Sequence, residues 1–149
     1  MPCLHERTFD ERKYRADRRD KKSEESNMNK RQIGANKEKL AAEYLESIGL
    51  KVIDRNYHTR YEEIDIVAKD EKTYVFVEVK YRNSDRYGSP LEAVNANKMR
   101  KISMGAVAYM NNHKLPIDNT PIRFDVIGIC GKDITYVKNA FDYTGINIM

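Results

Sequence analysis

The sequence predicts one α/β domain with two helices and five strands behind a charged tail, in the order helix, three strands, helix, two strands. Three observations predict it. Apolar residues recur at helical spacing near residues 35–47, and they alternate with polar residues over 63–68 and 73–80. Residues 89–92 carry the signals that begin a helix. At 149 residues, one core can bury enough apolar surface to fold without disulfides.

The first helix is expected over residues 35–47, and Gly49 is placed to end it. Residues at i, i+3, i+4 and i+7 form its apolar stripe, namely Ala41, Tyr44, Leu45 and Ile48. Residues 50–57 are typical of a short strand. The domain is therefore expected to begin with a helix that lies against a sheet.

Residues 63–68 and 73–80 predict a hairpin, since a polar stretch, 69–72, separates two strand-like runs. Side chains alternate faces along a strand, so Glu78 and Lys80 point to the same face. The three valines of the second run point to the other face. One side of this strand is therefore apolar and the other carries a charged pair.

The register of the hairpin decides where Asp65 lies. If Ala68 pairs with Thr73, Asp65 lies opposite Phe76 and diagonal to Glu78, on the face that carries Glu78. A shift of one residue would move Asp65 to the opposite face. The functional interpretation depends on this register.

A second helix is expected from Ser89 to about residue 111. Ser89 suits the N-cap, Pro90 the first helical position, and Glu92 the third position after the cap. Two further strands, at 122–127 and 134–137, complete the domain.

Residues 1–30 are expected to form a disordered charged tail, and residues 31–149 the folded domain. Residues 1–31 hold 10 Lys and Arg against 7 Asp and Glu, a net +3, and the remainder holds 17 against 16, a net +1. Net charge therefore gives little support for nucleic-acid binding by the domain itself. A solvated tail is the simpler interpretation of the first segment, and a nucleic-acid arm is the alternative.

Cys3 and Cys130 lie in different settings and do not suggest a disulfide framework. The charged N-terminal stretch contains no apolar run typical of a signal peptide or membrane span. We therefore expect a cytoplasmic protein that does not insert into membranes.

Asp65, Glu78 and Lys80 are the candidate catalytic group. Two carboxylates from neighbouring strands suit a hard cation such as Mg²⁺ or Mn²⁺. A lysine beside them can orient a nucleophile or offset charge on a phosphate. This chemistry indicates phosphodiester hydrolysis. The alternative is a surface pair of Glu78 and Lys80, which is common on a two-faced sheet.

Glu38 and Lys98 are further candidates. Glu38 lies on or beside the buried stripe of the first helix, where it can reach the metal cluster. The alternative is an acid in the first helical turn, favoured by the helix dipole. Lys98 interrupts an apolar stripe, either to contact phosphate or as a lysine at the edge of a packed face.

Four neighbouring residues form a basic and aromatic cluster that can meet a nucleic-acid backbone or simply end a strand: Arg55, Asn56, Tyr57 and Arg60. Asp125 interrupts an apolar strand. It can support the site by a hydrogen bond, although an edge or outward-facing position is the expected interpretation.

Several motifs in order resemble the YraN-like (UPF0102) family of bacterial proteins. They are the segments 32–35, 38–45, 55–57, 63–68, 75–80, 92–94 and 123–126, within a match that runs from about residue 33 to 141. That family is similar to the restriction-endonuclease-like PD-(D/E)XK nucleases and to archaeal Holliday-junction resolvases. The resemblance implies an α/β core with a central mixed five-stranded sheet flanked by helices.

The resemblance also implies a metal and catalytic set of Glu38, Asp65, Glu78 and Lys80. Two departures stand beside it, because Lys37 and Glu62 occupy positions where the family usually has glycine. Their side chains can crowd the site or alter the approach of the backbone.

The leading hypothesis is a metal-dependent endonuclease that acts on DNA in repair or recombination. The alternatives are a catalytically silent nucleic-acid-binding module with the same fold and a protein-protein adaptor. A homodimer would suit a two-fold-symmetric substrate.

Overall fold

The computed structural model describes residues 30–82 and 90–145, and its five strands form one sheet in the order β1-β2-β3-β4-β5. Only β3 and β4 are parallel, so the sheet is mixed. This confirms the predicted restriction-endonuclease-like core and the order αβββαββ. Along the chain the elements are α2 (Lys30–Ser47), β1 (Lys51–His58), β2 (Glu63–Asp70), β3 (Thr73–Arg82), the 3-10 helix η2 (Pro90–Ala93), α3 (Ala96–Asn112), β4 (Ile122–Cys130) and β5 (Asp133–Phe141).

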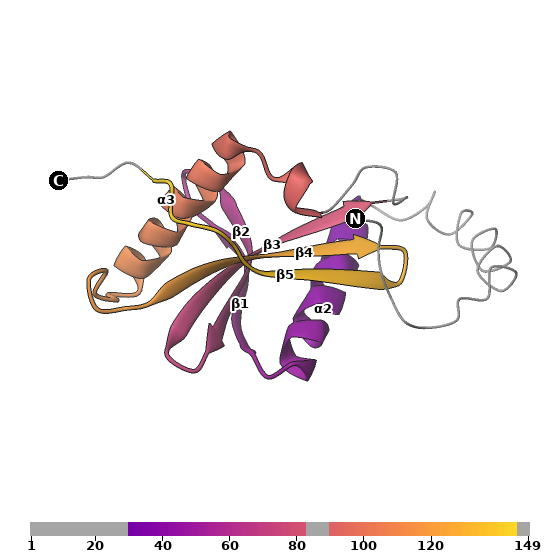
Figure 1. Cartoon of the computed structure of the whole chain (residues 1–149), viewed down its shortest axis with the longest axis horizontal. Coiled ribbons are helices and arrows are strands. Elements are labelled where there is room, and N and C mark those ends of the chain that lie inside the picture. The colour runs from indigo at the N-terminus through magenta and orange to yellow at the C-terminus, as the bar shows by residue number, and fades with distance from the viewer. Residues whose placement is uncertain (1–29, 83–89, 146–149) are drawn as a thin grey trace, which may run out of the picture.

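The two helices cover opposite faces of the sheet (Figure 1). The parallel pairing of β3 with β4 requires a crossover, and η2 and α3 lie in the connection between these strands. Two buried clusters result. The cluster under α2 includes Ala41, Leu45, Ile66, Val77 and Ile127. The cluster under α3 includes Phe76, Ile102, Ala106, Tyr109 and Phe124. Glu78 and Lys80 alternate with Val77 and therefore lie on the α3 face of β3.

The register of the hairpin between β2 and β3 differs from the predicted one. Asp70 pairs with Thr73, where the sequence analysis paired Ala68 with Thr73. The turn is shorter than expected because Glu71 adopts a left-handed φ of 54°, although the segment holds no glycine to signal a tight turn. The register moves by two residues, and a shift of two keeps each side chain on its face. The paired residues therefore keep their predicted faces. The pairing ends at Ile66 and Val77, and Ile64 and Ile66 pack in clusters on opposite faces, so the alternation does not continue through Asp65.

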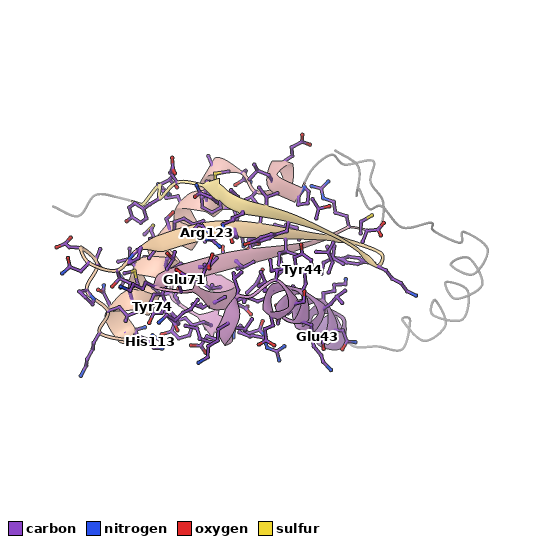
Figure 2. The ribbon with its side chains drawn as sticks, turned by 60° about the horizontal axis from the view of Figure 1, so that its bottom comes forward. Glu43, Tyr44, Glu71, Tyr74, His113 and Arg123 are labelled. Carbon is purple, nitrogen blue, oxygen red and sulfur yellow. The ribbon has the colours of Figure 1, made fainter. Side chains whose placement is uncertain are left out.

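α2 begins at Lys30, one residue inside the segment predicted to be a tail and before the predicted start at residue 35. Its stripe is also displaced, because Ala42 is buried while Ile48 is 44% exposed. Figure 2 shows Tyr44 on the side of α2 toward the strands, where its ring meets that of Tyr136 at a centroid distance of 6.0 Å. Gly49 follows the helix with a φ of 100°, and this positive φ agrees with the prediction that a glycine ends the helix. Residues 1–29, which make up most of the predicted tail, lie outside the described residues.

The predicted second helix is interrupted. Pro90 begins the short η2, and Asn95 caps a separate helix by accepting the Lys98 main-chain N–H at 2.8 Å. Ser89, the predicted N-cap, lies outside the described residues. The new cap places Lys98 in the first turn of α3. Within residues 30–82 and 90–145, none of the helices has the length and apolar character needed to cross a membrane.

η2 packs directly on β4. A methyl group added at Gly128 would overlap the Pro90 ring, so only glycine fits at this point of contact. Gly128 is the register partner of Lys80 in the parallel pair β3 and β4. The contact therefore fixes η2 close to Lys80.

Candidate acidic active site

Asp65 lies where the pairing of β2 and β3 ends. The register between these strands runs from Asp70 and Thr73 to Ile66 and Val77. At the next position, the Asp65 Oδ2 atom accepts the Val79 main-chain N–H at 2.8 Å. The carboxylate thus takes the place of a carbonyl acceptor between the strands. This position brings it near both faces of the sheet.

Glu78 is the most buried acid of this group, with 5% of its side chain exposed. Its Oε1 atom lies 3.1 Å from Lys80 Nζ and 3.5 Å from Lys98 Nζ. Lys98 also lies 3.2 Å from Glu62 Oε1. A buried carboxylate is thus flanked by two ammonium groups, one from its own strand and one from the first turn of α3.

Asp65 lies near other negatively charged side chains. Burial, followed by the charge of Glu78, raises the pKa of Asp65 to about 8, and the charge of Glu38 acts in the same direction. The hydrogen bond from Val79 and the charge of Lys98 oppose the rise. A carboxyl group in this position holds its proton until a positive charge compensates for its neighbours.

The charges of neighbouring residues also act on Glu38. Burial raises its pKa above the ordinary value, and Glu63 and Glu78 add to the rise. A hydrogen bond from the Asn56 side chain and the charge of Arg55 act in the opposite direction. Glu38 lies in the third turn of α2, so the interpretation as a first-turn acid is wrong. The charge of Glu78 thus acts on both Asp65 and Glu38, and that of Glu38 acts on Asp65.

The predicted nucleic-acid-binding residues are divided between two places. Arg55 and Asn56 lie on β1, whose register sets Asn56 beside Asp65, and both act on Glu38. Tyr57 is held against α3, where its hydroxyl accepts a hydrogen bond from Asn112 at 2.8 Å and its ring packs on Tyr109. Arg60 is exposed in the turn between β1 and β2. Lys98 is partly buried, and its Nζ atom lies 3.5 Å from Glu78 Oε1.

The candidate oxygen donors for a cation are the carboxylates of Asp65 and Glu78, and the charge of Glu38 also acts on Asp65. In the described part of the chain, three or more His, Cys, Asp or Glu side chains do not gather as a ready-made ligand set. Mg²⁺ commonly binds through one or two carboxylates and keeps several waters. The crowding that raises the pKa of Asp65 is the arrangement that a hard cation would relieve. The donor set therefore fits a two-carboxylate site.

Asp125 corrects a sequence-based prediction. It is fully buried in β4, which has a strand on either side, and is neither at a sheet edge nor outward-facing. Arg123 Nε donates to Oδ1 at 2.9 Å and its Nη2 atom to Oδ2 at 3.0 Å. Tyr136 OH and the Asn139 main-chain N–H donate to the same carboxylate, and Arg123 also binds Asp70 at 2.8 Å. Asp125 is thus the centre of a buried structural cluster.

Glu62 is a residue whose contact the sequence analysis missed. It was noted as a departure from a family glycine, and the structure pairs it with Lys98. The other departure, Lys37, places its Nζ atom 3.2 Å from the centroid of the Tyr81 ring. No sequence motif predicts the contact between Glu62 and Lys98, because the two residues are far apart in sequence and meet only in the fold.

A mixed sheet between two helices, with acids and lysines gathered where two central strands part, defines an α/β protein with a restriction-endonuclease-like core. Comparison with known proteins then shows that the chain belongs to the uncharacterised protein family UPF0102, whose model matches residues 37–129.

The chain is similar to three relatives that are themselves named only as UPF0102 proteins. The protein from Lachnoclostridium phytofermentans is 45% identical over 79% of this chain and 99% of its own length. One from Vibrio parahaemolyticus is 43% identical over 76% and 94%, respectively. One from Aliivibrio fischeri strain MJ11 is 41% identical over 78% and 96%. The match thus spans nearly the whole of each relative.

Proposed function

We propose that this protein is a Mg²⁺- or Mn²⁺-dependent nuclease that hydrolyses phosphodiester bonds in DNA. The observation that carries the proposal is the pair of acids, the partly buried Asp65 and the buried Glu78, beside two lysines. A buried acid that serves only structure is normally neutralised by its own surroundings, whereas Asp65 is held among like charges.

Asp65 and Glu78 would hold the cation, with Glu38 close enough to contribute to the charge. A divalent cation there would supply Lewis acidity toward a phosphate and a nucleophile at neutral pH. Because Asp65 holds its proton in the metal-free chain, it must release that proton to act as a ligand.

Lys80 and Lys98 supply the positive charge that the chain itself brings to the reaction. Each ammonium group lies within 3.5 Å of Glu78 Oε1, so both would face a phosphate that approaches the acids. Fixed cations of this kind stabilise the negative charge that accumulates on a phosphate during cleavage. Arg55, Asn56, Tyr57 and Arg60 would contact the backbone on either side.

The test is cleavage of supercoiled, single-stranded and branched DNA by the purified chain, with Mn²⁺ and with EDTA. Glu78→Gln should lower the metal-dependent rate by at least about 100-fold, the scale seen when a group that stabilises transition-state charge is lost. Glu92→Gln makes the same substitution at an exposed glutamate of η2 and should cleave normally. Equal cleavage by Glu78→Gln would mean a contaminating nuclease or a different site.

One observation favours a second candidate, a module that binds nucleic acid without cutting it. Glu78 already forms two ion pairs, so the chain offsets its charge without any added cation. Such a module would bind DNA with an affinity that falls as salt rises, and it would show no metal-dependent cleavage of any of the three substrates.

A further inference from the structure

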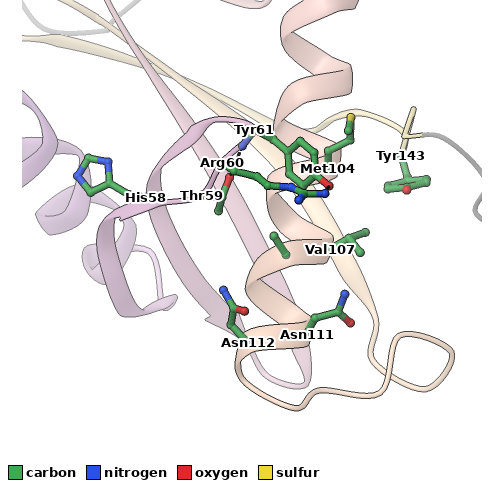
Figure 3. Close-up of a pocket in the computed structure, with 10 residues that line it drawn as sticks. His58, Thr59, Arg60, Tyr61, Met104, Val107, Asn111, Asn112 and Tyr143 are labelled. Atoms are coloured by element: carbon green, nitrogen blue, oxygen red, sulfur yellow. Dashed lines mark hydrogen bonds between the residues drawn. The ribbon is translucent and has the colours of Figure 1, made fainter.

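A pocket lies where α3 meets the turn between β1 and β2. Its volume is about 570 Å³, within the range of pockets that hold small organic ligands. The walls come from residues 58–61, from one side of α3 and from Tyr143 beyond β5 (Figure 3). None of the acids of the candidate active site lines this pocket.

The lining combines flat apolar surface with amide groups. Tyr61 and Tyr143 supply aromatic rings, and Val107 of α3 lies between them and the two amides at the end of the helix (Figure 3). Those amides are Asn111 and Asn112. Aromatic rings stack on any nucleobase, and side-chain amides can hydrogen-bond to base edges.

The charge of the pocket is suited to an anion. The guanidinium carbon of Arg60 lies 4.7 Å from the centroid of the Tyr61 ring, and Arg60 also donates a hydrogen bond to the Tyr61 hydroxyl. The lining residues, all within the described part of the chain, include no aspartate or glutamate. A ligand with an aromatic face and a nearby phosphate matches this combination better than a neutral apolar ligand does.

The same turn connects the pocket to the acidic site. Thr59 Oγ1 accepts the main-chain N–H groups of Tyr61 and Glu62, at 3.2 and 3.1 Å, and donates to the Glu62 carbonyl at 2.7 Å. The Glu62 carboxylate then binds Lys98, which contacts Glu78. One short turn and one helix therefore build both the pocket and one side of the acidic cluster.

We propose that this pocket receives an unstacked base of a nucleic-acid strand whose backbone runs on to Asp65 and Glu78. Bases within a duplex are stacked on both sides, so the pocket selects strands with unpaired bases, such as single-stranded or branched DNA. This inference takes nucleic acid as the ligand from the proposed function and adds the class of substrate.

The test compares two dye-labelled oligonucleotides of equal length, one of thymidines and one with abasic sites in place of the bases. The full chain is titrated into each in EDTA, and fluorescence anisotropy gives the Kd. The intact strand should bind about tenfold more tightly, the scale of one base stacked on an aromatic ring. In Tyr61→Leu the two affinities should become equal through loss of affinity for the intact strand alone. Tyr81→Leu, at an exposed tyrosine outside the pocket, should keep the difference.

Val107→Trp provides a second variant, which fills the pocket from α3 and leaves the turn intact, and it should also abolish the preference for bases. Equal binding of both oligonucleotides by the unaltered chain would overturn the inference, as would a preference that survives in both pocket variants. Because EDTA prevents cleavage, the outcome is independent of the nuclease assay. Metal-dependent cleavage without a base preference would rule out only the proposed role of the pocket. A base preference without cleavage would rule out only the proposed nuclease activity.

Discussion

Two acids in the same sheet, Asp125 and Asp65, have opposite surroundings. Asp125 accepts hydrogen bonds from both sides of the Arg123 guanidinium, from Tyr136 and from a main-chain N–H. Asp65 accepts the Val79 N–H but lies near the charges of Glu78 and Glu38. The first acid is held by its own chain. The second is arranged so that a cation from outside would stabilise it.

The difference separates a carboxylate that maintains the fold from the one that we propose binds the cation. Asp125 is fully buried and Asp65 is partly buried, and both lie within a strand of the sheet. The distinguishing property is whether the surrounding donors and cations already satisfy the charge.

Asp125→Ala should cause the largest loss of stability, because it leaves the Arg123 guanidinium largely buried with half of its ion pairs removed. Breaking a buried ion pair costs about 3–5 kcal/mol. The free energy of unfolding, measured by urea titration with circular dichroism, should fall by this amount. Asp118→Ala, at an exposed aspartate, should leave it unchanged. A loss below about 1 kcal/mol would mean that the cluster does not support the fold.

Gly128→Ala should destabilise the chain by about 1–3 kcal/mol, as overpacking does, because the added methyl group meets the Pro90 ring. Gly105→Ala is the matched control. There the added carbon would lie 3.4 Å from Ile64 and Thr59, an ordinary contact, and alanine favours a helix. The two variants should therefore move the melting temperature in opposite directions. Equal effects would show that η2 is not fixed against β4.

The pH dependence of stability in EDTA should identify Asp65. An unfolded aspartate titrates near pH 4, and in the fold its pKa is raised to about 8. Between these values the folded chain keeps a proton that the unfolded chain has lost, so the free energy of unfolding falls as pH rises. Asp65→Asn has no proton to lose, and its curve should be flatter across this window. Parallel curves for the two proteins would contradict the raised pKa.

Glu62→Gln should have the smallest effect on stability, because its ion pair with Lys98 is partly exposed and such pairs contribute roughly 0–1 kcal/mol. The pKa of Lys98 is raised by Glu78 and Glu62 against the effect of burial, so it should fall in this variant. Nuclear magnetic resonance of the lysine Nζ can follow that titration. An unchanged pKa for Lys98 would mean that Glu62 does not hold it.

The strands and their order along the chain could be predicted because alternation of apolar residues marks the strands directly. The register of the hairpin could not be predicted. The turn at Glu71 depends on a left-handed φ in a residue that rarely adopts one, and the sequence offers no glycine there. The error of two residues preserves the faces of the paired residues, but the pairing ends at Ile66 and Val77, one position before Asp65.

The surroundings of each acid could not be read from the sequence. Asp125 is satisfied in part by Tyr136 and Asn139, which belong to the neighbouring strand β5, and their contacts depend on the pairing of β4 with β5. Lys98 reaches Glu78 because Asn95 starts a new helix, whereas the clearer cap signal at Ser89 predicted one continuous helix. Local patterns thus locate the acids, and contacts distant in sequence decide what each of them does.

Calorimetric titration with Mn²⁺ near pH 7 tests the central claim most directly, namely that Asp65 and Glu78 together hold one cation. Performed in two buffers that differ in ionisation enthalpy, it also counts released protons. The unaltered chain should bind Mn²⁺ and release about one proton, supplied by Asp65. Asp65→Asn should lose this binding, whereas Asp70→Asn, the same substitution in the Arg123 cluster, should retain it. Binding of Mn²⁺ by Asp65→Asn with the affinity of the unaltered chain would contradict the claim.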